Sequence, residues 1–395
     1  MRTVSGSAFY SEIQSRMTHF ARRILVCLLL GMMALFTLGF TPPTLVDREI
    51  APTQRRTLGQ LRQQAQFQQT PAVASRSYLV YDVQADATLM AINPDQPLAQ
   101  ASLTKLMTAL LVLEREAAEP GFLQSTVRIQ PSDLVGGATM GLVSGESLTV
   151  EDLLWGILLP SGNDAATALA RVTAGSVEGF VNAMNRRAAE LGLTQTQFAN
   201  PEGLDAPGHH TSAKDLLTLT QADWAFPLFQ RIVGTASASV AGHALQSTNE
   251  MLGSYAGING VKTGTTDVAG QCLVVSVEQD GHQRLAVILG SNARYADART
   301  LLDQADLFFS RNPGPGERLT ALERMVGTEG KVWLLRPLGD APDLLLPRWQ
   351  RQDLQLYRRL DLPPLIESWQ PGLTAGVLEW RLGGEVVGTQ VLVLE

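Results

Sequence analysis

The stretch Ala101-Ser-Leu-Thr-Lys105 opens a strongly apolar segment that continues through Leu106-Met-Thr-Ala-Leu-Leu-Val-Leu113. This pattern predicts a buried helix over residues 103–115, and a spacing of three places Ser102 and Lys105 on one face of it. Burial makes a lysine amine lose its proton more easily, and a neutral amine can accept the proton of a serine hydroxyl. The pair therefore predicts a nucleophile beside its base, although a capping serine with a solvated lysine would show the same spacing.

A second polar motif, Ser161-Gly162-Asn163, follows an apolar run and precedes a predicted helix. A hydroxyl and an amide two residues apart on a turn can face one pocket. We expect Ser161 to relay a proton to a leaving amine and Asn163 to bind the backbone of a substrate. Taken alone, the motif is more typical of an ordinary turn at a helix N-terminus.

The third motif, Val261-Lys262-Thr263-Gly264-Thr265-Thr266, is predicted to lie on an edge strand. The charge of Lys262 would depress the pKa of a neighbouring amine and attract a carboxylate. Gly264 has no side chain, so a peptide ligand could lie against the strand there. A polar β-turn is the alternative, but two of the only four lysines in the chain fall within these motifs.

Ser-x-x-Lys, Ser-x-Asn and Lys-Thr-Gly, in this order, mark penicillin-recognising serine enzymes. The sequence resembles the low-molecular-mass penicillin-binding proteins, which are serine-type D-alanyl-D-alanine carboxypeptidases, over roughly residues 75–311. Further similar stretches are Ser161-Gly-Asn-Asp-Ala-Ala166, Leu191-Gly-Leu193, Ala199 to Asp205, Ser212-Ala-Lys-Asp215 and Gly260-Val-Lys-Thr-Gly264. The resemblance implies an α/β (α+β) catalytic domain of the β-lactamase/transpeptidase type, with a helical insertion.

The resemblance also implies roles for individual residues in cleaving peptidoglycan stem peptides. Ser102 attacks the carbonyl of the penultimate D-alanine, Lys105 is the general base, and Ser161 returns a proton to the leaving amine. The backbone N–H groups of Ser102 and Thr265 form the oxyanion hole. The expected substrate-binding residues are Asn163, Lys262, Thr263, Gly264, Thr265 and Arg294. A β-lactam would acylate the same serine and leave slowly.

Arg294 follows the predicted strand 284–290 and resembles the family's Arg-aromatic stretch. It would bind the free carboxylate of a substrate, because arginine can pair with a carboxylate through two hydrogen bonds. The alternative is that it caps a surface loop. The chain departs from some family members in having Thr265 where they carry histidine, and in ending as a strand instead of an amphipathic helix.

Other functions are possible on the same motifs. A D,D-endopeptidase that cuts peptidoglycan cross-links would differ only in its leaving group. A β-lactamase is less expected, because no deacylating carboxylate motif is evident between Ser161 and Lys262. A non-catalytic, membrane-tethered scaffold that binds the cell wall is the alternative of another class. The intact Ser102, Lys105 and Lys262 argue against it.

The N-terminal segment indicates the compartment. Arg22-Arg23 precede an uncharged apolar run, residues 24–40, and Pro42-Pro43 follow it. This is the layout of a secretory signal or a signal-anchor, with a run close to the lower limit of ~17 residues for a spanning helix. We expect residues 1–40 to anchor the protein to the membrane or to be cleaved, residues 41–75 to be a linker, and the rest to be extracytoplasmic, in a periplasm or at the cell surface.

The composition and the local sequence pattern give the remaining expectations. A net charge of -7 argues against nucleic acid as a partner, and the histidines lack zinc spacing, so no metal or cofactor is expected.

The catalytic domain is predicted over 76–311 and a small all-β domain over 317–395, separated by Asn312-Pro-Gly-Pro-Gly316. The predicted hairpin covers 78–83 and 88–92, further strands 260–266, 271–278 and 284–290, and helices 151–159, 164–172, 177–191, 212–225 and 297–310.

Overall fold

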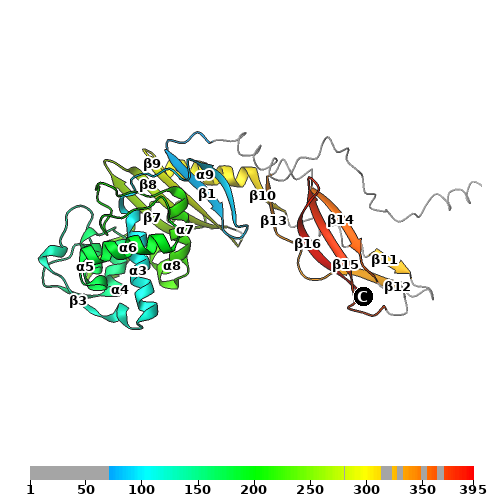
Figure 1. Ribbon diagram of the computed structural model, residues 1–395, viewed down its shortest axis with the longest axis horizontal. Coiled ribbons are helices and arrows are strands. Elements are labelled where there is room, and N and C mark those ends of the chain that lie inside the picture. Colours follow the sequence, from blue (N-terminus) through cyan, green and yellow to red (C-terminus); the bar gives the residue numbers. More distant parts are fainter. Residues whose placement is uncertain (1–70, 280, 313–322, 327–331, 348–353, 363–368) are drawn as a thin grey trace, which may run out of the picture.

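The computed structural model describes residues 71–395 except residue 280 and the segments 313–322, 327–331, 348–353 and 363–368 (Figure 1). The expected signal or anchor, residues 1–40, and nearly all of the expected linker lie outside the described residues. Within the described part, no helix is both long and apolar enough to cross a membrane.

A five-stranded antiparallel sheet organises the larger part of the chain, with the strand order β2-β1-β9-β8-β7. The strands are β1 (Ser77–Asp82), β2 (Ala87–Ile92), β7 (Ile258–Thr266), β8 (Gly270–Gln279) and β9 (His282–Ser291). The N-terminal hairpin thus joins three strands from much later in the sequence. The sheet is built from both ends of the domain, as predicted, and the strand with the Lys-Thr-Gly motif is its edge.

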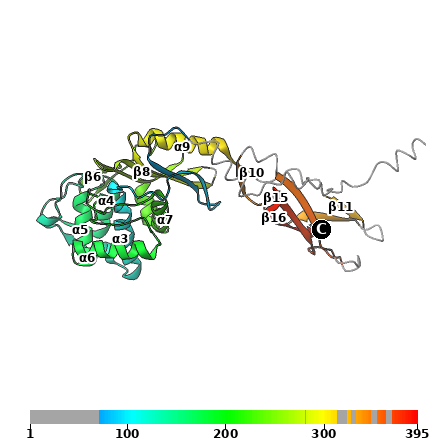
Figure 2. The same ribbon diagram turned by 45° about the horizontal axis from the view of Figure 1, so that its top comes forward.

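Helices cover both faces of this sheet (Figures 1 and 2). One face carries the inserted helical layer: α3 (Lys105–Ala118), α4 (Val150–Leu158), α5 (Asn163–Ala174), α6 (Val177–Glu190), α7 (Ala213–Trp224) and α8 (Pro227–Val233). The other face carries α9 (Arg294–Phe308). Side chains alternate along β8: Cys272 and Val274 pack toward the inserted helices, while Leu273 and Val275 pack toward α9.

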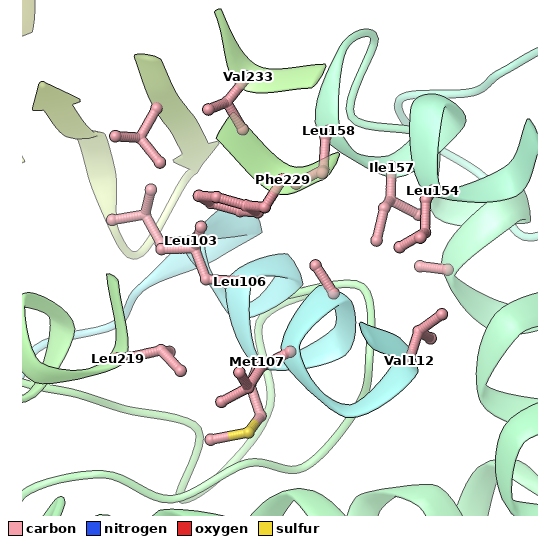
Figure 3. Packing of buried hydrophobic residues seen from close by; sticks show 14 of the residues in the cluster. Leu103, Leu106, Met107, Val112, Leu154, Ile157, Leu158, Leu219, Phe229 and Val233 are labelled. Carbon is pink, nitrogen blue, oxygen red and sulfur yellow. The ribbon is translucent and has the colours of Figure 1, made fainter. Parts of the chain in front are cut away.

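The core of the helical layer forms around α3. Figure 3 shows Leu103, Leu106 and Met107 pointing into a cluster that includes Phe229 of α8 and Leu158 of α4. These side chains are almost completely buried, as the apolar run after Lys105 predicts. The same burial holds the start of α3, and with it Ser102 and Lys105, in a fixed place.

Two predicted helices differ from the structure at their ends. The apolar helix expected over 103–115 begins as a 3-10 turn, η2 (Ala101–Thr104), before α3. The closing helix expected over 297–310 begins at Arg294, directly after β9, and ends at Phe308. Its end is earlier because the next residues form strand β10 (Phe309–Asn312), which pairs with β13 (Leu344–Pro347).

Several short elements had no prediction: α8, the pair β3 (Thr126–Arg128) with β4 (Ser147–Thr149), and the hairpin β5 (Ser237–Val240) with β6 (His243–Gln246). The C-terminal region is all β, as predicted. Its five-stranded antiparallel sheet has the order β11-β12-β16-β15-β14. The strands are β11 (Glu323–Val326), β12 (Val332–Pro337), β14 (Leu354–Leu360), β15 (Thr374–Leu382) and β16 (Glu385–Leu394), around a core with Trp380.

Candidate active site

The turn that carries Ser102 lies directly against strand β7. A β-carbon built on Gly264 would be 3.0 Å from each of three atoms of the turn: the Ala101 β-carbon, the Gln100 oxygen and the Ser102 nitrogen. Real β-carbons rarely approach other atoms so closely, so the glycine allows the strand and the turn to meet. The sequence predicts that a peptide ligand lies against Gly264, but in the structure the turn beside the nucleophile fills the space next to this residue.

A second glycine supports the turn from the other side. Gly203 has a φ of +90°, and a β-carbon there would collide with the carbonyl of Ala101, itself at a φ of +49°. The loop before α7 therefore packs its backbone against the nucleophile turn. Both glycines are required by a close approach that joins segments more than a hundred residues apart in the sequence.

A buried histidine completes the support of the turn. The N–H of Ala199 donates to Nδ1 of His209 over 2.8 Å, so Nε2 carries the hydrogen and donates to the Thr104 hydroxyl at 2.7 Å. That hydroxyl donates in turn to the Ala101 carbonyl at 2.8 Å. Burial, and then the neighbouring His210, lower the pKa of His209 to about 4. The ring is therefore neutral at physiological pH and holds the turn through a fixed tautomer.

Lys105 is 0% exposed and has three partners at its amine nitrogen: Ser102 Oγ at 3.1 Å, Asn163 Oδ1 at 2.8 Å and the carbonyl oxygen of Glu202 at 2.6 Å. Burial lowers its pKa to about 7, against the opposing charges of Glu202 and Asp164. An amide oxygen and a carbonyl oxygen can only accept hydrogen bonds. A neutral amine donates its two hydrogens to them, which leaves its lone pair facing the Ser102 hydroxyl.

The start of α5 supplies the second motif. Besides its bond to Lys105, Asn163 donates through Nδ2 to the carbonyl of Gly136 at 2.7 Å. Ser161 is 5% exposed, with a φ of +66°, and its hydroxyl has no hydrogen-bond partner in the structure. Asp164 accepts bonds from the backbone N–H groups of Met140 and Leu142 and so fixes the loop beside Asn163.

Strand β7 brings the third motif to the same place. Lys262 is 1% exposed, and burial, followed by the charges of Lys105 and Arg294, places its pKa well below its ordinary value. Its amine donates to the carbonyl of Thr263 at 2.9 Å. The Thr263 hydroxyl lies 2.6 Å from that of Thr248. Two buried lysines therefore lie within each other's electrostatic reach beside Ser102.

Arg294 reaches β7 from the first turn of α9. Its Nη1 donates to the carbonyl of Gly264 and to the hydroxyl of Thr265, both at 2.8 Å, while its buried Nε has no partner in the structure. The guanidinium therefore lies on the motif strand and does not simply cap a surface loop. Thr265 itself is exposed, so this end of the strand is open to a ligand.

The structure thus gathers the predicted residues from η2, α5, β7 and α9 into one site. It adds residues that the sequence argument did not single out: Glu202, Asp164, His209 and Thr248. Glu202 lies between Pro201 and Gly203, in a stretch that the family resemblance already included. That resemblance was the sequence signal that could have identified Glu202 as a site residue. Within the described residues, no cluster of three His, Cys, Asp or Glu side chains could hold a metal ion.

Comparison with known proteins identifies the family of the chain. The family model described as D-alanyl-D-alanine carboxypeptidase matches residues 64–293. The chain is similar to the D-alanyl-D-alanine carboxypeptidase DacF of Bacillus subtilis, with 31% identity over 75% of this chain and 78% of the relative.

Two solved structures share the fold. The D-alanyl-D-alanine carboxypeptidase DacD of Francisella tularensis matches 82% of this chain and 94% of its own with a TM-score of 0.59 and 22% identity. The penicillin-binding protein D2 of Listeria monocytogenes, in an ampicillin-bound form, matches 60% of this chain and 98% of its own with a TM-score of 0.55 and 28% identity. The predicted fold class and family are confirmed, and the chain belongs to the serine-type D-alanyl-D-alanine carboxypeptidase family.

Proposed function

We propose that this protein removes the terminal D-alanine from peptidoglycan stem peptides through an acyl-enzyme on Ser102. The observation that carries the proposal is the arrangement at Lys105. Its amine is completely buried, its two hydrogens are taken by oxygens of Asn163 and Glu202, and its remaining position faces the Ser102 hydroxyl. This arrangement supports Lys105 as the base and Ser102 as the nucleophile.

The proposed reaction proceeds in two balanced steps. Ser102 Oγ bonds to the carbonyl carbon of the penultimate D-alanine while its proton moves to Lys105. The N–H groups of Ser102 and Thr265 stabilise the oxyanion. The C–N bond then breaks as the leaving D-alanine takes a proton through Ser161, beside Lys262. Water then adds to the acyl carbon, the ester bond between that carbon and Ser102 Oγ breaks, and a proton of the water returns to Oγ as the shortened peptide leaves.

Binding of substrate would use the strand β7 and the groups around it. The peptide would lie along Lys262 to Thr265, with Asn163 on its other side and its C-terminal carboxylate near Thr263 and Arg294. A β-lactam would enter the same place and acylate Ser102, and the similarity to the ampicillin-bound Listeria protein supports this. We also infer an extracytoplasmic location, tethered or released, from the apolar run at 24–40; a phosphatase reporter fused after residue 75 would test it.

The test of the nucleophile uses a fluorescent penicillin. The wild-type protein should be labelled on Ser102, as located by peptide mass spectrometry. Ser102→Ala should lose both the label and the release of D-alanine while keeping its melting temperature. Label on a different residue of the wild type would overturn the proposal, and absence of any label would favour the non-catalytic scaffold.

A second experiment separates two peptidase activities that share the site. Purified muropeptides are supplied either as monomers with a D-alanyl-D-alanine end or as cross-linked dimers. We expect release of D-alanine from the monomers. Cleavage confined to the dimers would identify a D,D-endopeptidase instead, since only the leaving group differs between the two reactions.

A further inference from the structure

The carboxyl group of Glu202 is a buried acid within the active site. Glu202 is only 5% exposed, and its own carbonyl oxygen accepts the Lys105 amine at 2.6 Å. The loop is held on both sides: the carbonyl of Pro201 accepts the Thr108 hydroxyl of α3 at 2.9 Å, and Gly203 packs against the nucleophile turn. The backbone at Glu202 is therefore held between α3 and the nucleophile turn, beside Ser102 and Lys105.

Thr167 of α5 contacts the carboxyl group of Glu202. The Thr167 hydroxyl lies 2.5 Å from Glu202 Oε1 and 3.0 Å from the carbonyl of Asn163, and it has one hydrogen to give. The Asn163 carbonyl lies four residues back along the same helix, where the helical backbone also supplies a donor. The hydroxyl is thus free to donate to Glu202 Oε1, and this bond holds the carboxyl group beside α5.

Few charged groups lie near Lys105, and its two acidic neighbours differ in how many hydrogen-bond donors compensate their charge. The acids are Glu202 and Asp164; the cation facing them is Lys262, with Arg294 beyond it. His209 lies under the same turn but is neutral. Asp164 is already saturated, because it accepts hydrogen bonds from the backbone N–H groups of residues 140–142 and from the Thr139 hydroxyl. Glu202, with the single Thr167 donor on its carboxylate among the described contacts, is the less compensated charge.

We propose that Glu202 is a positioning residue of acylation, whose carboxylate stabilises the ammonium that forms on Lys105 when the Ser102 proton arrives. The inference rests on the proposed function and deepens it. During the step, the proton leaves Ser102 Oγ and joins Lys105 Nζ while the matching negative charge develops on the carbonyl oxygen of the substrate. The proton later departs to the leaving group, so Lys105 is the side chain whose charge changes. Glu202 remains a carboxylate throughout and sets the proton affinity of the base.

The test is the pH profile of acylation by a fluorescent penicillin, between pH 5 and pH 9. Glu202→Gln removes the charge but keeps the size and the hydrogen bond to Thr167. Loss of an opposing charge lowers the pKa of Lys105, so the acid limb should move down by on the order of one pH unit. The plateau rate should also fall, because a weaker base takes the proton less readily. Glu202→Asp retains the charge and should keep the acid limb of the wild type.

Glu202→Met provides a second neutral variant if the glutamine variant does not fold, as judged by its melting temperature. A folded neutral variant with an unmoved acid limb overturns the inference, and so does an equal shift in Glu202→Asp. Failure here is distinguishable from failure of the proposed function, because the wild type would still be labelled on Ser102. Absence of that label in the wild type would instead remove the proposed function itself.

Discussion

At the scale of single residues, Lys105 shows how a fold makes a base out of a lysine. Burial alone lowers the pKa of its amine, and the two acids nearby only partly oppose the effect, so the result is about 7. A lysine on the surface would stay charged near pH 10. By excluding water from one nitrogen, the site therefore obtains an amine that can lose its proton near neutral pH, next to the hydroxyl that it deprotonates.

Lys105→Arg is expected to lower the rate of acylation by orders of magnitude. Arginine keeps the charge and approximate length, but its guanidinium cannot lose a proton near neutral pH. The measurement is the second-order rate constant of labelling with a fluorescent penicillin, with circular dichroism as a check of folding. Near-normal acylation by a folded variant would show that another group is the base.

Arg294→Ala is expected to raise KM for peptides with a free C-terminal carboxylate. The guanidinium lies on β7 through Gly264 and Thr265, in reach of a ligand on that strand. C-terminally amidated peptides lack the charge, so their KM should change much less. Equal losses on both kinds of peptide would identify a structural role in holding β7, and the carboxylate would then be bound by Lys262 and Thr263.

At the scale of elements, the site depends on the approach of the η2 turn to strand β7. Gly264 and Gly203 allow the turn to be enclosed from two sides, and His209 ties its Thr104 to the loop before α7. Each of these contacts joins elements rather than sequence neighbours. The nucleophile is therefore positioned by three segments, and a small shift in any of them should change the rate of acylation of Ser102.

Gly264→Ala is expected to slow acylation by on the order of 10-fold to 100-fold, because a shift of about 1 Å in a catalytic group can cost that much. The new methyl group would contact the backbone at Gln100 and Ser102 too closely, so the strand or the turn would have to shift. Gly136→Ala is the matched control: its methyl group would meet no atom within 4 Å, and its carbonyl still holds Asn163. Equal rates in the two variants would contradict the close approach.

The free energy of unfolding of the protein should depend on pH through His209, which supports the nucleophile turn. Its pKa is about 4 in the folded protein and about 6.5 in an unfolded chain, so between these values the folded form binds fewer protons. The free energy of unfolding should therefore fall as the pH drops from 6.5 to 4, by about 3 kcal/mol in total from this group. Urea unfolding of wild type and His209→Gln at both pH values measures it. A fall of the same size in the variant would exclude His209 as the cause.

At the scale of the whole molecule, the three motifs lie at one end and the C-terminal sheet at the other (Figures 1 and 2). The connection runs from α9 into β10, which pairs with β13 of the C-terminal region. The buried cores of the catalytic sheet and of the C-terminal sheet are separate clusters. The chemistry should accordingly be contained in the part that ends with α9.

A truncated chain of residues 75–315 is expected to keep its reactivity with penicillin. It retains η2, α5, β7 and α9, and among the described strands that it keeps only β10 loses its partner, β13. The measurement is the labelling rate relative to the full chain, with the melting temperature of each. A truncated chain that folds but does not react would show that the C-terminal region contributes to the site.

The sequence by itself determined the architecture and the main chemical groups. The apolar runs of β8 and β9, the apolar run after Lys105 and the late all-β region follow from local sequence patterns, which each segment carries by itself. The order and spacing of Ser102, Ser161 and Lys262 identified a family, and the structure places them together. The predicted bounds of α9 were wrong at both ends: the helix begins at Arg294, with two residues between it and the end of β9 at Ser291, and its end is decided by the pairing of the next residues with a distant strand.

Only the tertiary structure decided what surrounds the nucleophile. Glu202 is about one hundred residues from Lys105, His209 a similar distance from Thr104, and Gly264 still farther from Ala101. No local period links such positions, because they meet only when the sheet closes over the inserted helices. The proton affinity of Lys105 depends on this enclosure, since exclusion of water and the approach of the Glu202 charge are properties of the packed site rather than of any segment.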